Sequence, residues 1–170
     1  MSGPLAVFIG PMGAGKTRVG KRVAKALGVP FTDSDKVIVA RHGAIADIFD
    51  THGEPHFRAL ERDVVHEALQ GSGVVSLGGG AVLAEATRDE LRELPVVYLT
   101  ISADAVASRL GDGKRPLARG GVGDWQRILD ARRSVYEGLA RVTFDTSRLP
   151  IDRIAEDVVD WIRRNGLEYR

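Results

Sequence analysis

The sequence contains no cysteine, which excludes disulfides, thiolate metal sites and cysteine nucleophiles and fits a reducing compartment such as the cytoplasm. It also lacks a charge excess, because 24 Lys and Arg are balanced by 23 Asp and Glu; this balance does not favour nucleic acid as a partner. No apolar run approaches the roughly 20 residues that span a bilayer, and no secretory signal opens the chain. These absences predict one soluble cytoplasmic domain of 170 residues without membrane partners, for which we expect a monomer.

Short apolar runs alternate with helical patterns along the chain. The helical patterns occupy the segment that ends at Leu27, residues 103–110, residues 124–140 and the C-terminal segment from Ile151. The alternation predicts an α/β domain whose parallel sheet is covered by helices on both faces. The expected buried strands are Leu5–Ile9, Val74–Leu77, Val96–Ile101 and Val142–Phe144, with a weaker one around Phe31.

The stretch GPMGAGKT at residues 10–17 fits the pattern G-x-x-x-x-G-K-[ST] and lies between an apolar strand and an amphipathic helix. Its glycines let the backbone curl so that several N–H groups point into one concavity, and the following helix adds its positive end. Lys16 then supplies a mobile ammonium for the β- and γ-phosphates, and the Thr17 hydroxyl is suited to Mg²⁺. The alternative is a glycine-rich turn without a ligand, but the matching flanks favour nucleotide binding.

Two absences narrow the class of nucleotide-binding protein. The only asparagine is Asn165, near the C-terminus, so the Asn-Lys-x-Asp guanine reader of GTPases is missing. The chain is also too short for the large modules of motor ATPases. A kinase acting on a small molecule remains, and it requires an acceptor site, cations at the transferred phosphoryl group and a cover against water.

Several polar side chains could build that acceptor site. Asp33 and Asp35 share a face at the expected end of the second strand, where one carboxylate could support Mg²⁺ and the other a substrate hydroxyl; alternatively they only cap the next helix. Arg58 and Glu61 lie one helical turn apart. Either Arg58 is a fork that binds a carboxylate and Glu61 holds it in place, or the two form only a surface ion pair. The glycine triplet at residues 78–80 forms either a tight turn or a close approach to a ligand.

Three further features received specific interpretations. The segment 111–123 carries five glycines and is either a plain surface loop or a mobile lid, the latter favoured if the site lies nearby. His52 and His56 are four residues apart, but Gly53 and Pro55 interrupt regular helix between them, so we expect no metal site. Trp125 and Trp161 fall within amphipathic patterns and are expected to serve packing.

In order, GPMGAGKT, DSD, GEPHFR, GGGA, KRPLA and RRSVYE closely resemble the motifs of the shikimate kinase family over nearly the whole chain. The resemblance implies transfer of the γ-phosphoryl group of ATP to the 3-hydroxyl of shikimate, a step toward chorismate and the aromatic amino acids. It implies a three-layer P-loop kinase fold with a five-stranded parallel sheet. It further implies one kinase domain over residues 1–170, with a helical substrate-binding region at 34–63 and a lid at 111–123.

The resemblance also assigns roles to individual residues. Lys16, Asp35 and Arg115 are the expected catalytic residues, with Asp35 as the base. Thr17 and Asp33 are expected to hold Mg²⁺. The family pattern Arg-x-Pro-Leu-Tyr is matched to the segment that starts at Arg133, although the adjacent Arg132 is an alternative. The expected ATP-binding residues are Gly13, Ala14, Gly15, Lys16, Thr17, Arg18, Arg115 and Arg148. The expected shikimate-binding residues are Asp35, Arg58, Gly79, Gly80 and Arg133, the two arginines as clamps for the carboxylate.

Two other functions remain compatible with the phosphate loop. A related kinase for another polyol acid, such as gluconate, needs neither the glycine triplet nor both arginines. A regulatory module that binds ATP only as a signal leaves the set of Asp35, Arg58 and Arg133 without a purpose.

Overall fold

The computed structural model describes residues 3–110 and 121–167. Five parallel strands form one sheet in the order β2-β3-β1-β4-β5. The strands are β1 (Pro4–Ile9), β2 (Phe31–Asp33), β3 (Gly73–Ser76), β4 (Val96–Thr100) and β5 (Val142–Asp145). Each of the expected strands is therefore confirmed to within two residues, including the weak one at Phe31.

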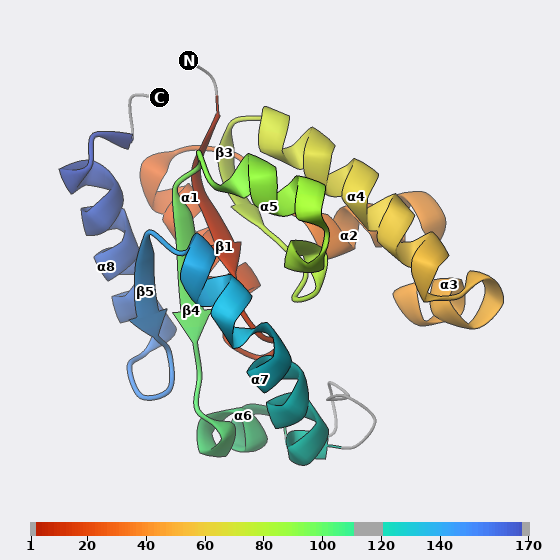
Figure 1. Cartoon of the computed structure of the whole chain (residues 1–170). Coiled ribbons are helices and arrows are strands. Elements are labelled where there is room, and N and C mark those ends of the chain that lie inside the picture. The colour runs from red at the N-terminus through yellow and green to blue at the C-terminus, as the bar shows by residue number, and fades with distance from the viewer. Residues whose placement is uncertain (1–2, 111–120, 168–170) are drawn as a thin grey trace.

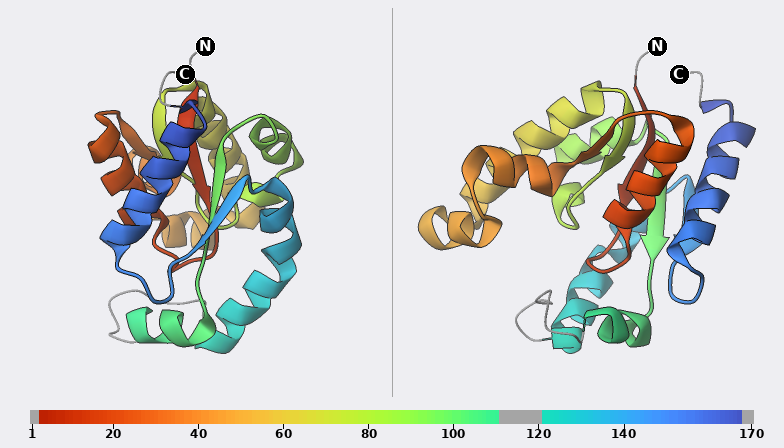
Figure 2. Two further views of the ribbon diagram at one scale, coloured as in Figure 1. Left: turned by 90° about the vertical axis from the view of Figure 1, so that its left-hand side faces the viewer. Right: turned by 180° about the vertical axis from the view of Figure 1, so that it is seen from behind.

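Helices cover both faces of the sheet and make three layers. The helices α1 (Lys16–Leu27) and α8 (Ile151–Arg164) pack together on one face, whereas α5 (Glu85–Leu91) and α7 (Gly121–Leu139) lie over the other (Figures 1 and 2). The central strand β1 is fully buried, as expected for a parallel sheet covered on both sides. The expected three-layer α/β fold is confirmed.

A second, smaller layer of helices projects beyond the edge strand β2 (Figure 1). It consists of α2 (Ser34–His42), α3 (Ile45–His52) and α4 (Glu54–Gln70). These helices share their own apolar cluster, formed by Ile38, Ile48, Phe57 and Val64, apart from the main core. The segment 34–63, for which we expect substrate binding, overlaps these helices; α4 continues to Gln70, and its Val65 and Leu69 join the main core.

The remaining elements lie around the ends of the strands. α6 (Ala103–Leu110) begins after Ser102, whose hydroxyl accepts a hydrogen bond from the Ala105 N–H. The 3-10 turn η1 (Ala81–Leu83) and α5 were not predicted. Of the expected lid at 111–123, residues 111–120 lie outside the described part of the chain, and residues 121–123 form the first turn of α7. Within the described ranges, no helix combines the length and apolarity needed to cross a bilayer.

Candidate active site

The loop between β1 and α1 is curled by glycines in the left-handed region. Gly10, Gly13 and Gly15 have φ values of 143°, 86° and 93°, which side chains disfavour. At Gly10 the backbone also approaches β4 so closely that a Cβ would lie 2.3 Å from the Leu99 carbonyl oxygen. The sequence places glycine here because no larger residue fits.

The outward carbonyl groups of this loop are all bound by donors. Lys16 Nζ donates to the carbonyls of Gly10 and Pro11 at 2.7 and 3.1 Å. Successive carbonyls then accept from the Trp125 indole, the Arg109 guanidinium and the Thr146 hydroxyl. Carbonyl and N–H point in opposite directions across a trans peptide. The bonds that hold the Met12 and Ala14 carbonyls therefore aim the N–H groups of Gly13 and Gly15 the other way, and both of these glycines line the concavity. The Ala14 N–H instead donates to the Pro11 carbonyl at 3.3 Å.

A cavity of about 520 Å³ opens over this loop, and we call it the loop cavity. Of the residues expected to bind ATP, it is lined by Gly13, Gly15, Lys16, Thr17 and Arg18. Ala14 is buried within the loop, Arg148 is exposed and does not line the cavity, and Arg115 lies outside the described residues. The expected contacts of Arg148 and Arg115 with ATP stay predictions.

Arg109 and Ile151 are among the lining residues that were not expected from the sequence. Arg109 donates to Gly13 O at 3.4 Å and to the hydroxyl and carbonyl of Thr146. Burial and the nearby Arg18 lower the pKa of Arg109. The only sequence signal for this role was the position of Arg109 in the last turn of α6, next to the expected lid. That signal is weak, because the helix dipole favours a cation in the last turn of any helix.

Lys16 and Thr17 face the two carboxylates at the start of α2. The Thr17 hydroxyl donates to Asp33 Oδ2 at 2.6 Å, while Asp33 Oδ1 caps α2 by accepting from the N–H groups of Asp35 and Lys36. Burial lowers the pKa of Lys16 to about 8, opposed by the charges of Asp35 and Asp33. The capping and ligand interpretations of Asp33 are thus compatible, because its two oxygens face different partners.

Asp35 lines the loop cavity and also a neighbouring cavity of about 440 Å³, which we call the arginine cavity. Burial raises the pKa of the Asp35 carboxyl, Asp33 raises it further, and the cations Lys16 and Arg58 oppose both effects. A carboxylate with a raised pKa at the junction of two hollows is typical of a catalytic base.

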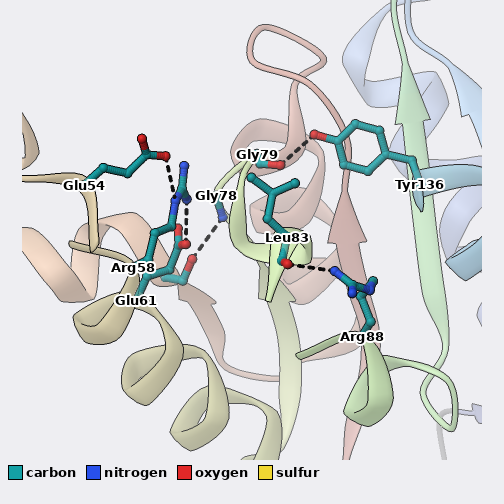
Figure 3. A network of polar contacts seen from close by, with 9 residues as sticks. Glu54, Arg58, Glu61, Gly78, Gly79, Leu83, Arg88 and Tyr136 are labelled. Carbon is teal, nitrogen blue, oxygen red and sulfur yellow. Dashed lines mark hydrogen bonds and ion pairs between the residues drawn. The ribbon is translucent and has the colours of Figure 1, made fainter. Parts of the chain in front are cut away.

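The arginine cavity presents two guanidinium groups, from Arg58 and Arg132. Arg58 Nη1 pairs with the buried Glu61 at 2.7 Å, and its Nε lies 3.5 Å from Glu54 (Figure 3). Burial raises the pKa of Glu61, and the Arg58 charge opposes this. The remaining wall is largely apolar and includes Ile45, Phe49, Phe57, Trp125, Ile128 and Leu129.

The expectation that Arg133 faces this cavity is corrected by the structure. Arg133 is half-exposed and pairs with Asp130 at 3.0 Å, whereas Arg132 lines the cavity together with Tyr136. The reason is helical geometry: Arg132 and Tyr136 lie four residues apart on one face of α7, and the next residue is rotated by about 100°. The tyrosine of the family pattern therefore selects Arg132.

Each glycine of the triplet faces a different functional side chain. A Cβ on Gly78 would lie 2.5 Å from Asp35 Oδ1, and one on Gly80 would lie 2.5 Å from two nitrogens of Arg58. A Cβ on Gly79 would lie 3.5 Å from Arg132 Nη1. The Gly79 carbonyl accepts a hydrogen bond of 2.6 Å from the Tyr136 hydroxyl (Figure 3). The Gly78 N–H donates to the buried Ser34 hydroxyl at 3.0 Å. The triplet therefore closely approaches protein side chains, and its approach to a ligand stays a prediction.

His52 and His56, at the end of α3 and the start of α4, are in contact through their rings. The rings of His52 and His56 lie with their centroids 4.5 Å apart. Among residues 3–110 and 121–167, no group of three or more His, Cys, Asp and Glu is placed to hold a metal ion.

The fold and these adjoining cavities define a P-loop kinase with a small acidic acceptor. The family model for shikimate kinase matches residues 12–163, and the chain belongs to the shikimate kinase family. A shikimate kinase of Corynebacterium efficiens is 43% identical over 92% of this chain and 95% of its own length. One of Thermobifida fusca is 46% identical over 91% and 92%. A solved structure of the Acinetobacter baumannii enzyme in complex with shikimate has a TM-score of 0.85 and 31% identity over 97% of this chain and 95% of that one.

Proposed function

We propose that the loop cavity holds the phosphates of ATP and the arginine cavity holds shikimate, in the reaction of this family. The reaction transfers the γ-phosphoryl group of ATP to the 3-hydroxyl of shikimate and belongs to aromatic amino acid biosynthesis. The observation that carries the assignment is the position of Asp35, which lines both cavities with Lys16 on one side and Arg58 on the other. Family membership leaves no role for the regulatory module or the gluconate kinase that the loop alone permitted.

Recognition of shikimate rests on its single carboxylate and its polyhydroxylated ring. Arg58 and Arg132 supply two planar forks in one hollow, and such forks bind a carboxylate through paired hydrogen bonds. Glu61 and Glu54 hold Arg58 in place without neutralising both guanidinium groups. Gly79 and Gly80 line the same cavity, and their backbone is proposed to contact the ring.

Asp35 accepts the proton of the 3-hydroxyl as its oxygen attacks the γ-phosphorus. The new O–P bond forms while the bond between the γ-phosphorus and the β–γ bridging oxygen breaks, so ADP leaves with the electron pair. Lys16 stabilises the charge that develops on the phosphoryl oxygens, and Arg115 is proposed to join it. Positioning provides most of the acceleration, because phosphoryl transfer needs no covalent nucleophile.

Thr17 and Asp33 fit a magnesium ion. Mg²⁺ prefers oxygen ligands and is commonly held by one or two protein oxygens together with substrate phosphates. The Thr17 hydroxyl and an Asp33 oxygen meet beside the phosphate loop at 2.6 Å. When bound there, the ion neutralises negative charge on the β- and γ-phosphates, and these two residues would position it.

To test the assignment, the protein is incubated with ATP and Mg²⁺, and the release of ADP is followed with and without shikimate. The same measurement is repeated with a panel of other polyhydroxy acids. We expect ADP release to depend on shikimate and to be weak with gluconate. ADP release that is equal with and without every acid would contradict the proposed acceptor. Light scattering of the same sample tests the expected monomer, and the absence of cysteine suits the cytoplasm, where we expect the enzyme to act.

A further inference from the structure

One face of α7 forms a wall of the arginine cavity. The lining residues of this helix are Trp125, Ile128, Leu129, Arg132 and Tyr136, and their spacing of three and four residues keeps them on one side. Trp125 is only 3% exposed. The packing role expected for this tryptophan is therefore confirmed, but its indole has a second contact.

Two hydrogen bonds join this helix to the loops on either side of the site. The Trp125 indole Nε1 donates to the carbonyl of Met12 in the phosphate loop at 2.8 Å. The Tyr136 hydroxyl donates to the carbonyl of Gly79 at 2.6 Å. The two donors are separated by 11 residues, about 16 Å along a helix, so α7 connects the phosphate loop with the glycine triplet.

The bond to Met12 acts on a peptide that is exposed to the ligand. The Met12 carbonyl and the Gly13 N–H belong to one planar peptide and point in opposite directions. Holding the carbonyl toward Trp125 therefore directs the Gly13 N–H into the loop cavity, which Gly13 lines. Gly13 has a φ of 86° and carries no side chain that could restrain this peptide.

We propose that Trp125 is a positioning residue that couples the two substrate sites. Its N–H fixes the Met12–Gly13 peptide for the phosphates, and its ring forms part of the wall against which shikimate packs; this second half rests on the function proposed above. Shikimate that presses on the ring restrains the indole and with it the loop. Nucleotide and shikimate then each bind more tightly in the presence of the other.

The substitution Trp125→Phe tests this, because phenylalanine keeps an aromatic ring but has no N–H. The matched control is Trp161→Phe, since Trp161 lies on α8 and lines neither cavity. The dissociation constant of ADP with Mg²⁺ is measured by calorimetry with and without shikimate. We expect Trp125→Phe to weaken ADP binding about fivefold, as for the loss of one hydrogen bond, and to bring the effect of shikimate on ADP affinity close to none. The control keeps both values of the unmodified protein.

Fluorescence gives an independent measurement of the contact. In Trp161→Phe the only remaining tryptophan is Trp125, and we expect saturating shikimate to change its emission. In Trp125→Phe the only remaining one is Trp161, whose emission should stay constant. If Trp125→Phe does not fold, replacing Trp125 with the benzothiophene isostere, in which sulfur takes the place of N–H, removes the donor at nearly constant volume.

The results separate this proposal from the proposed function. Shikimate that releases no heat on binding contradicts the acceptor assignment, while the ADP affinity of Trp125→Phe still tests the hydrogen bond to the loop. The role of Trp125 is overturned if shikimate binds without changing the emission of Trp125. It is also overturned if Trp125→Phe and the control have the same ADP affinity and the same effect of shikimate on it. An unmodified protein in which shikimate leaves ADP affinity unchanged overturns it as well.

Discussion

The guanidinium of Arg58 lies so close to Gly80 that a Cβ on the glycine would stand 2.5 Å from both of its terminal nitrogens. Gly80 has φ −94° and ψ 0°, a conformation that other residues also adopt. The glycine is therefore needed for the space it leaves to Arg58 rather than for its backbone freedom. Figure 3 shows this arginine held between Glu54 and Glu61, directly beside the triplet.

Gly80→Ala should displace the guanidinium, because the far end of a side chain moves more readily than backbone. We expect the KM for shikimate to rise about tenfold or more, as when a charged hydrogen bond is lost, with the KM for ATP and the Tm little changed. Steady-state kinetics and thermal melting check this. Gly138→Ala is the matched control, since a Cβ at that position in α7 meets nothing within 4 Å; equal behaviour of the two variants would rule out the steric role of Gly80.

Arg132→Ala and Arg133→Ala separate the two candidate carboxylate clamps. Arg132 lines the arginine cavity, whereas Arg133 pairs with Asp130 on the surface. We expect Arg132→Ala to lower kcat/KM for shikimate by about 10- to 100-fold, because a charged donor is lost, and Arg133→Ala to stay within about twofold, because exposed pairs contribute little. Shikimate titrations at saturating ATP measure both, and the reverse ranking would restore the assignment that the sequence favoured.

Asp35→Asn removes the proposed base while keeping its shape. Loss of a general base typically costs about 10² to 10⁴ in rate, so we expect kcat to fall within that range. The fold raises the pKa of the Asp35 carboxyl above its value in the unfolded chain. Ionisation of this group therefore lowers the free energy of unfolding as the pH rises above the unfolded-state pKa. Melting at neutral pH should therefore show no decrease in Tm for Asp35→Asn. A large decrease would mean that the lower rate reflects misfolding.

The pKa of Lys16, lowered by burial to about 8, predicts how the free enzyme responds to alkaline pH. The ammonium that meets the phosphates is present below this pKa and is lost as pH rises through it. We expect kcat/KM for ATP to decline above about pH 8. Lys16→Arg, although slower, should lose this decline because arginine keeps its charge; a decline that persists in this variant would assign the titration to another group.

The order and type of the main elements could be predicted from local pattern. Buried parallel strands appear as short apolar runs, and Gly28 ends α1 in the left-handed conformation, with φ 67°. The elements that were missed are short, because η1 has three residues and α5 has seven. Their formation depends on packing against α4, which a local pattern does not record.

The sequence by itself determined the chemistry of the phosphate loop, because a contiguous stretch of glycines, lysine and threonine builds its own concavity beside the strand that precedes it. Only the tertiary structure decided which residues meet across the site: that Arg132 rather than Arg133 enters the cavity, that Arg109 and Trp125 bind the loop carbonyls, and that each glycine of the triplet faces a particular side chain. The physical reason is that these contacts join segments up to about a hundred residues apart. A rotation of about 100° between neighbouring helix residues decides which of two adjacent side chains enters the cavity.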